Sequence, residues 1–363
     1  MIGDLSRRRV LAVDTESNSL YVYREQVCLV QFSTGTEDYL VDPLAIRDLS
    51  PLRGIFSDDG IVKVFHAAEY DLICLKRDYG FEFRSIFDTM IAARTLGRSR
   101  LSLANLLEDE FGIRLDKRYQ RANWGKRPLS PEMLAYARQD THYLIPLRER
   151  MTSALEKQER LPLAEEDFRR MCQVCPPQAP NHNGDLPPRL GGIKDLTRQQ
   201  EAVLWELFRY REKTAQEANL PPFRIYTNQA LINLAVACPE DEKELAAVRD
   251  ISPRQARRHA GGLIRAVRRG MQGEAPKKSH DHKPRPDERH MARLEALRQW
   301  RKNAGRQLGV ESDVVMPREV MEAIAERNPS NLEQLQEAMQ SIPWRFQRFG
   351  REIMEVLNPK EGK

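Results

Sequence analysis

One stretch constrains this chain more than any other: VLAVDTE, from Val10 to Glu16. Its first four residues are apolar, which is typical of a strand covered on both faces. Asp14 and Glu16 are two positions apart, and side chains at that spacing on a strand point to the same side. Two carboxylates held together repel each other unless a proton or a cation lies between them. The stretch predicts a site for Mg²⁺ or Mn²⁺, with a turn-capping Asp14 and a solvated Glu16 as the alternative.

Length and composition predict a protein of several domains. The 363 residues are enough for two or three domains, and 40% hydrophobic with 31% charged residues provides cores and a well-solvated surface. No apolar run approaches the roughly 20 residues of a membrane span, and the N-terminus lacks the pattern of a signal peptide. Five scattered cysteines fit a reducing compartment. We expect a cytoplasmic protein, favour a monomer, and expect neither a membrane partner nor a small-molecule cofactor.

Positive charge is concentrated in one part of the chain. Residues 251–310 contain 16 Lys or Arg and 5 Asp or Glu, a net charge of +11 in a chain whose total is +5. A basic C-terminal half beside an acidic N-terminal half indicates polyanion binding in one and metal chemistry in the other. We predict that the basic part binds nucleic acid, the alternative being a solvated charged face. In a helix, one face would carry Arg254, Arg257, Arg258 and Arg265.

The N-terminal part of the chain predicts a mixed sheet with helices on its faces. Apolar segments at 21–23 and 27–33 follow the first strand closely, and 38–42 adds a further strand. Such tight connections favour antiparallel pairing. A helix is expected over about 44–56, followed by a buried strand at 61–65. This order of strands and helices is that of an α/β domain.

Two further acids follow predicted strands. Asp71 would lie in the first turns of the helix after strand 61–65, at the kind of sheet edge where ligands bind. The alternative for Asp71 is an acid that favours the start of the helix through the helix dipole. Asp88 is interpreted as the cap of a helix from Met90 to Leu96.

Residues 115–124 form a polar stretch that is rich in basic and aromatic side chains. Basic groups neutralise phosphates and aromatic rings stack on bases, so the stretch predicts contacts with nucleic acid. The alternative is an ordinary loop around a packed Trp. The candidate contact residues are Lys117, Arg121 and Trp124.

The last helix of this half begins at Ser130-Pro-Glu, with a capping residue, a proline at the first helical position and an early acid. On that helix Tyr136 and Asp140 are four residues apart, so they share a face. An acid and a phenol on one face can reach one site together.

The C-terminal part contains an internal repeat. Leu204–Arg211 aligns with Leu294–Arg301, and the same offset of 90 residues holds at several later anchors, which include Pro239 and Pro329. A constant offset is typical of a duplicated unit, and each copy is predicted to be a helical bundle of about 70 residues with short loops. The second copy has basic residues three apart, at Arg345, Arg348 and Arg351.

Taken together, these motifs resemble a known family. Three of them resemble the motifs of the DEDD-superfamily exonucleases, tyrosine branch: Asp-x-Glu at 14–16, an Asp at 71, and Tyr-x-x-x-Asp at 136–140. Phrases such as Phe65-His-Ala-Ala are similar to those of ribonuclease D. The resemblance covers about residues 8–155, and the two helical copies resemble HRDC domains.

The resemblance implies a ribonuclease H-like α/β nuclease domain with a mixed sheet, followed by two small all-α bundles that bind nucleic acid. The implied parts are an exonuclease domain at 1–170, a linker at 171–192, a first HRDC-like domain at 193–270, a basic linker at 271–288 and a second HRDC-like domain at 289–358.

The resemblance also implies the activity, which is stepwise release of nucleoside 5′-monophosphates from RNA 3′ ends, such as those of tRNA precursors, with two divalent cations. It implies that Asp14, Glu16 and Asp140 hold one ion and that Asp14 bridges to the second. Asp71 would support the second ion, and Tyr136 would orient the attacking water. The alternatives are a DNA exonuclease with the same site chemistry, and a non-catalytic RNA-binding protein, against which the intact acids count.

Overall fold

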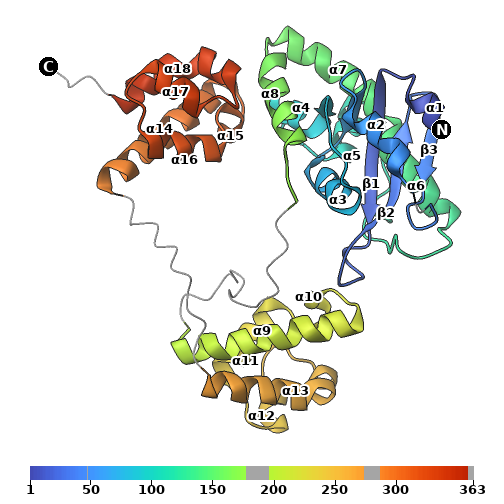
Figure 1. The fold of residues 1–363 in the computed structure, drawn as a ribbon, viewed down its shortest axis with the longest axis vertical. Helices are drawn as coiled ribbons and strands as arrows, with labels where there is room; N and C mark the ends of the chain where they lie inside the picture. Colours follow the sequence, from blue (N-terminus) through green and yellow to red (C-terminus); the bar gives the residue numbers. More distant parts are fainter. Residues whose placement is uncertain (47, 177–195, 274–286, 359–363) are drawn as a thin grey trace. The chain divides into compact units, whose positions relative to one another are not determined.

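The computed structural model describes residues 1–46, 48–176, 196–273 and 287–358 (Figure 1). The chain divides into two compact units. Of the described residues, one unit holds 1–17, 27–46, 48–176 and 287–358, and the other holds 18–26 and 196–273. The predicted linkers fall mostly on 177–192 and 274–286, which lie outside the described residues.

The first unit is built on a mixed sheet of five strands in the order β3-β2-β1-β4-β5. β1 pairs antiparallel with β2 and parallel with β4, because the β1–β2 connection is short whereas a helix separates β1 from β4. The predicted mixed sheet is confirmed. The strands are β1 (Val10–Ser17), β2 (Val27–Ser33), β3 (Asp38–Val41), β4 (Val62–Phe65) and β5 (Ile86–Asp88).

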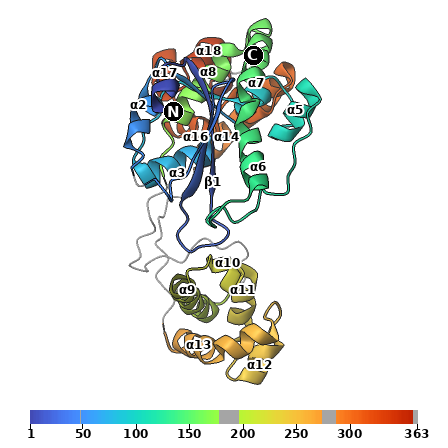
Figure 2. The same cartoon turned by 90° about the vertical axis from the view of Figure 1, so that its right-hand side faces the viewer.

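Helices cover both faces of the sheet. Alternate residues of β1 enter two different cores: Leu11 and Val13 pack on the face of α2 and α3, whereas Ala12 packs on the face of α4 and α7. Figures 1 and 2 both show α6 running beside β1. The helices are α1 (Ile2–Leu5), α2 (Arg53–Ser57), α3 (Glu69–Tyr79), α4 (Thr89–Thr95), α5 (Leu103–Phe111), α6 (Pro131–His142), α7 (Leu144–Lys157) and α8 (Leu161–Cys172).

Two predicted elements are wrong. Residues 21–23 form no strand, because the segment 18–26 leaves the sheet and belongs to the second unit, where the Tyr23 hydroxyl donates to Glu212 at 3.3 Å. The helix predicted over 44–56 starts only at Ser50, as a 3₁₀ turn that leads into α2. Before it, the Asp42 carboxylate accepts hydrogen bonds from two following backbone N–H groups and so holds a turn.

The internal repeat is confirmed helix by helix. Each helix of the second copy begins 90 residues after its counterpart in the first. The first copy consists of α9 (Arg198–Ala218), α10 (Pro222–Ile225), α11 (Asn228–Ala237), α12 (Glu242–Ala247) and α13 (Pro253–Gln272). The second consists of α14 (Glu288–Leu308), α15 (Ser312–Val315), α16 (Arg318–Arg327), α17 (Leu332–Ala338) and α18 (Pro343–Leu357).

The same internal contact recurs in both copies. Nη1 of Arg211 donates to the carbonyl of Tyr226 at 3.3 Å, and Nη1 of Arg301 donates to the carbonyl of Met316 at 3.0 Å. Both members of each pair keep the 90-residue offset, so the duplication extends to side-chain packing. Among the helices that the structure describes, none is long and apolar enough to cross a membrane.

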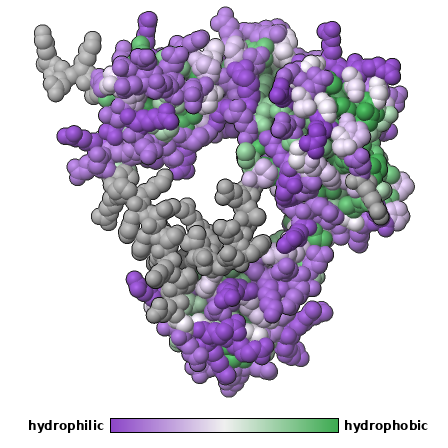
Figure 3. Space-filling model, viewed as in Figure 1, coloured by the Kyte–Doolittle hydropathy of each residue, from purple (hydrophilic) through white to green (hydrophobic). Residues whose placement is uncertain are grey.

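The two copies differ in their basic side chains. Arg254, Arg257 and Arg258 are exposed on α13, which begins with a capping box between Ser252 and Gln255. Figure 3 shows a largely hydrophilic surface on this copy. Arg345, which the sequence grouped with Arg348 and Arg351, is fully buried instead.

The burial of Arg345 has a clear electrostatic cause. Its guanidinium donates to Glu166 at 2.9 Å and to Asp167 at 2.6 Å, both on α8 in the same compact unit. A buried charge is tolerated where it is paired, so this arginine is committed to an internal ion pair. The predicted basic face of the second copy therefore lacks Arg345.

Candidate active site

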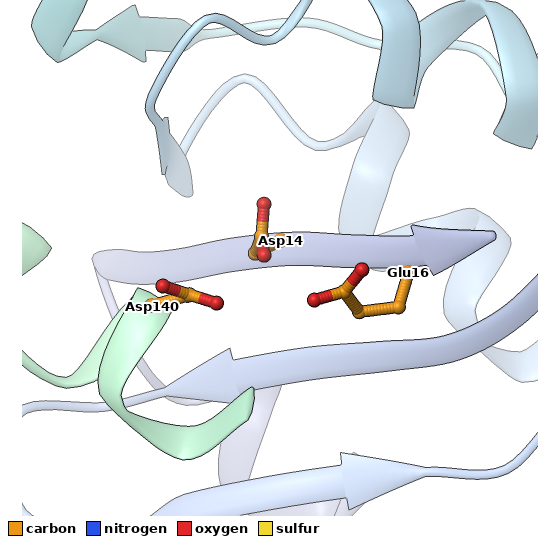
Figure 4. A group of neighbouring side chains, drawn as sticks. All are labelled: Asp14, Glu16 and Asp140. Carbon is orange, nitrogen blue, oxygen red and sulfur yellow. The ribbon is translucent and has the colours of Figure 1, made fainter. Parts of the chain in front are cut away.

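The predicted acids of β1 meet an acid of α6. Ligand oxygens of Asp14, Glu16 and Asp140 lie within 4.8 Å of one another. Figure 4 shows the three side chains gathered between β1 and α6. Asp14 and Glu16 share a face of β1 because they are two residues apart. Asp140 reaches the same place from α6, which begins where the Ser130 hydroxyl accepts a hydrogen bond from the Met133 N–H at 3.2 Å.

The electrostatics of this cluster favour a cation. Burial, followed by the charges of Asp71, Asp140 and Glu16, raises the pKa of Asp14 well above its ordinary value. Burial and neighbouring carboxylates raise the pKa of Glu16 to about 9, and burial raises that of Asp140 to about 7. Carboxylates held this close repel one another when they are ionised. A hard divalent cation suits these oxygen ligands, because its positive charge offsets that repulsion.

Asp71 lies beside the three clustered acids but outside their group. It is in the first turn of α3, as predicted, and its carboxylate accepts a short hydrogen bond from the Thr15 hydroxyl of β1. Burial raises the pKa of Asp71 to about 7. Its charge in turn raises the pKa of Asp14, so the two acids interact.

Asp88 has the structural role that the sequence predicted. It caps α4 by accepting hydrogen bonds from the N–H groups of Met90 at 2.8 Å and Ile91 at 3.1 Å. Its other oxygen accepts from the N–H of Ala68 at 2.7 Å. Asp88 therefore also fixes the turn that leads into α3 and so places Asp71.

Tyr136 lies one turn before Asp140 on α6, so both side chains project from one face of the helix. Burial first, and then the charges of Asp140 and Glu16, raise the pKa of the Tyr136 phenol above its usual value. The phenol therefore remains protonated at neutral pH and can donate a hydrogen bond near the cluster.

The prediction that Trp124 contacts nucleic acid is wrong. Its side chain is only 1% exposed, and the centroid of its ring lies 6.0 Å from that of Tyr136. A buried ring cannot stack on a base, so the packed-Trp alternative describes this loop, and Trp124 supports Tyr136. Lys117 and Arg121 are exposed on the same loop, and their contact with nucleic acid stays a prediction.

Sequence reasoning missed two residues near the site. Arg127 anchors the Trp124 loop by donating to the Cys28 carbonyl and to Asp42, both at 2.7 Å. Gln31 is fully buried in β2, directly opposite Asp14. The sequence offered a signal for Gln31, because it is the one polar residue in the otherwise apolar segment VCLVQF, from Val27 to Phe32. Arg127 had no such signal, since its partners are distant in sequence.

Comparisons with known proteins agree with this arrangement. Residues 1–156 match the family described as 3′-5′ exonuclease, and residues 200–267 and 290–357 match the HRDC domain. Ribonuclease D of Pseudomonas paraeruginosa is 28% identical over 352 residues, which cover 96% of this chain and 92% of that protein. The exosome complex exonuclease RRP6 of Saccharomyces cerevisiae is 32% identical over 282 residues, 74% of this chain and 38% of that protein.

A solved structure supports the same relationship. A mutant form of the catalytic core of RRP6 from Trypanosoma brucei is 30% identical and has a TM-score of 0.65, covering 76% of this chain and 78% of that one. The chain spans less than two-fifths of the length of the RRP6-type relatives that it matches. With exonuclease and HRDC matches along most of its length, the chain belongs to the 3′-5′ exonuclease family, in the group of ribonuclease D and RRP6.

Proposed function

We propose that this protein is a metal-dependent 3′-5′ exoribonuclease that releases nucleoside 5′-monophosphates from RNA. The observation that carries the proposal is the meeting of Asp14, Glu16 and Asp140 in one cluster, with Tyr136 one helical turn away. Similarity to ribonuclease D and to an exosome complex exonuclease supports RNA as the substrate class. We propose structured RNA 3′ ends, such as those of tRNA precursors, as the natural substrates.

Each residue has a defined part in the proposed reaction. Asp14, Glu16 and Asp140 would hold divalent cations, Mg²⁺ or Mn²⁺, and Asp71 would support a second ion. Such ions supply Lewis-acid stabilisation of the phosphate and a lowered pKa of water. The Tyr136 phenol, kept protonated by burial, would orient the attacking water by a hydrogen bond.

The cysteines support a reducing compartment such as the cytoplasm. None of the five forms a disulfide in the structure, and two of them, Cys28 and Cys74, are buried in the nuclease core region. A chain of this size with several cysteines and no disulfide is typical of such compartments.

The direct test is degradation of one RNA labelled at either end. We expect the 3′ label to appear at once as a mononucleotide, while the 5′-labelled RNA shortens progressively. A chelator should stop both reactions, and added Mg²⁺ or Mn²⁺ should restore them. A DNA oligonucleotide of the same sequence should be degraded more slowly. Release of the 5′ label first, or full activity in chelator, would contradict the proposal.

We also propose that the exposed arginines of α13 bind RNA. Phosphate contacts add affinity, and this affinity falls as the salt concentration rises. Each contact with a single strand makes the slope of log K against log salt steeper by about 0.7. In the full chain, Arg257→Glu with Arg258→Glu should therefore weaken binding of long RNA and flatten this slope. Turnover of a short strand at saturating concentration should not change.

The matched control changes the net charge equally on another helix of the same copy. Arg209 and Lys213 of α9 are exposed, and each is ion-paired with a glutamate on its own helix. Arg209→Glu with Lys213→Glu should leave RNA binding closer to that of the unmodified chain. Superimposable salt plots for the α13 variant and the unmodified chain would mean that this face does not touch RNA.

A further inference from the structure

Gln31 is a buried polar side chain whose amide has no hydrogen-bond partner among the described residues. The residue is 0% exposed, and both Nε2 and Oε1 are unpaired. Buried side-chain amides in native proteins nearly always bond to protein or water at one end at least. An amide that is unpaired at both ends therefore points to a group that the protein chain does not itself supply.

The sheet register places this amide next to the acidic cluster. In the antiparallel ladder of β1 and β2, Gln31 is the direct partner of Asp14, and Leu29 is the direct partner of Glu16. Directly opposed residues project from the same face of a sheet. Leu29 packs against Ala137 of α6, so this face lies under the helix that carries Tyr136 and Asp140.

The chemistry of an amide suits this position. A lysine or arginine beside Asp14 would neutralise its carboxylate and compete with a divalent cation for it. A neutral amide donates a hydrogen bond without adding charge. Carboxylates that bind metal ions are themselves held by such outer hydrogen bonds, which fix their orientation.

We infer that Gln31 is a positioning residue for Asp14, donating from Nε2 to a water molecule that also bonds to the Asp14 carboxylate. Oε1 accepts a hydrogen bond from water held in the same site. This inference deepens the proposed function, because it concerns how the chain holds the carboxylate on which cation binding depends. A buried core glutamine with no role in the site would have no effect on cation affinity.

The test compares two substitutions on one face of β2 in the full chain. Gln31→Met keeps the length of the side chain and removes the amide. Leu29→Met, the control, changes packing beside Glu16 without touching a polar group. Mn²⁺ affinity is measured by calorimetry without RNA, the melting temperature is measured without metal, and kcat and KM are measured with RNA.

Without metal, we expect Gln31→Met to melt no lower than the unmodified chain, since it removes a buried amide that bonds to no protein group that the structure describes. Its Mn²⁺ affinity should fall by about 10- to 100-fold, the usual loss when an outer hydrogen bond to a metal ligand is removed. Its kcat should fall with little change in KM, and Leu29→Met should match the unmodified chain in affinity and kcat.

Unchanged Mn²⁺ affinity in Gln31→Met would overturn the inference. If the melting temperature also fell, the amide would have a purely structural role. Failure of the proposed function gives a different result. In that case the unmodified chain binds Mn²⁺ but degrades no RNA, and the affinity comparison between the two variants still decides the role of Gln31.

Discussion

Asp14→Asn should abolish RNA cleavage while the fold survives. Asparagine keeps the shape of the side chain and removes its charge, so the variant loses a ligand that we propose serves both cations. Residues that act as a unit lose nearly all of their joint effect when one is removed, so the expected fall in turnover is on the order of 10⁴-fold. The pKa of Asp14 is raised by burial and like charges, so removing its charge relieves repulsion and should not destabilise the metal-free protein.

The measurement is single-turnover cleavage of labelled RNA, with the melting temperature as the check on folding. Asp59→Asn is the control, because Asp59 is an exposed acid outside the cluster, ion-paired with the exposed Arg84. It should cleave normally, whereas Asp140→Asn should behave like Asp14→Asn. Near-normal turnover in a folded Asp14→Asn variant would refute the assignment of Asp14 as a shared ligand.

Local geometry was sufficient to predict the two halves of the cluster. Alternation along a strand puts Asp14 and Glu16 on one side, and a four-residue spacing on a helix does the same for Tyr136 and Asp140. Joining these halves is a long-range event that no local rule describes. The resemblance to a known family supplied that link, and the structure confirms that the acids come together.

Burial of single polar or aromatic residues could not be predicted in the same way. Trp124 and Arg345 both lie in segments with the composition of an exposed nucleic-acid surface. Each is buried by partners far away in sequence: Trp124 packs in one cluster with Cys28 and Leu29 of β2, and Glu166 of α8 pairs with Arg345. Arg257 of α13 is exposed, and no acid of the residues that the structure describes pairs with it. The difference between these residues lies in the tertiary partner, which composition does not encode.

The repeat shows the opposite case, in which sequence predicted structure well. An offset of 90 residues between apolar anchors was enough to align all the helices of the two copies. This worked because each copy is a small bundle whose core is formed by its own helices. The copies differ at Gln255 and its counterpart Arg345: Gln255 caps the start of α13, whereas Arg345 is buried in an ion pair with Glu166.

Tyr136→Phe should reduce turnover by about 10²- to 10⁴-fold, the range expected when a group that orients or protonates a reacting atom is lost. Phenylalanine keeps the ring, so its packing at 6.0 Å from Trp124 and from Tyr119 should persist and the fold should not change. RNA affinity should stay nearly constant, because the hydroxyl is proposed to contact the attacking water rather than the substrate.

Tyr119→Phe is the matched control, since it removes a hydroxyl from the neighbouring ring and leaves the Tyr136 phenol in place. Turnover and RNA affinity are measured for both variants at saturating Mg²⁺. If affinity falls in Tyr136→Phe while turnover does not, the phenol binds substrate. If turnover falls equally in both variants, the effect comes from disturbed packing of the ring cluster. A loss of turnover confined to Tyr136→Phe is the result that a water-orienting hydroxyl requires, because only that hydroxyl projects from the helical face that also carries Asp140.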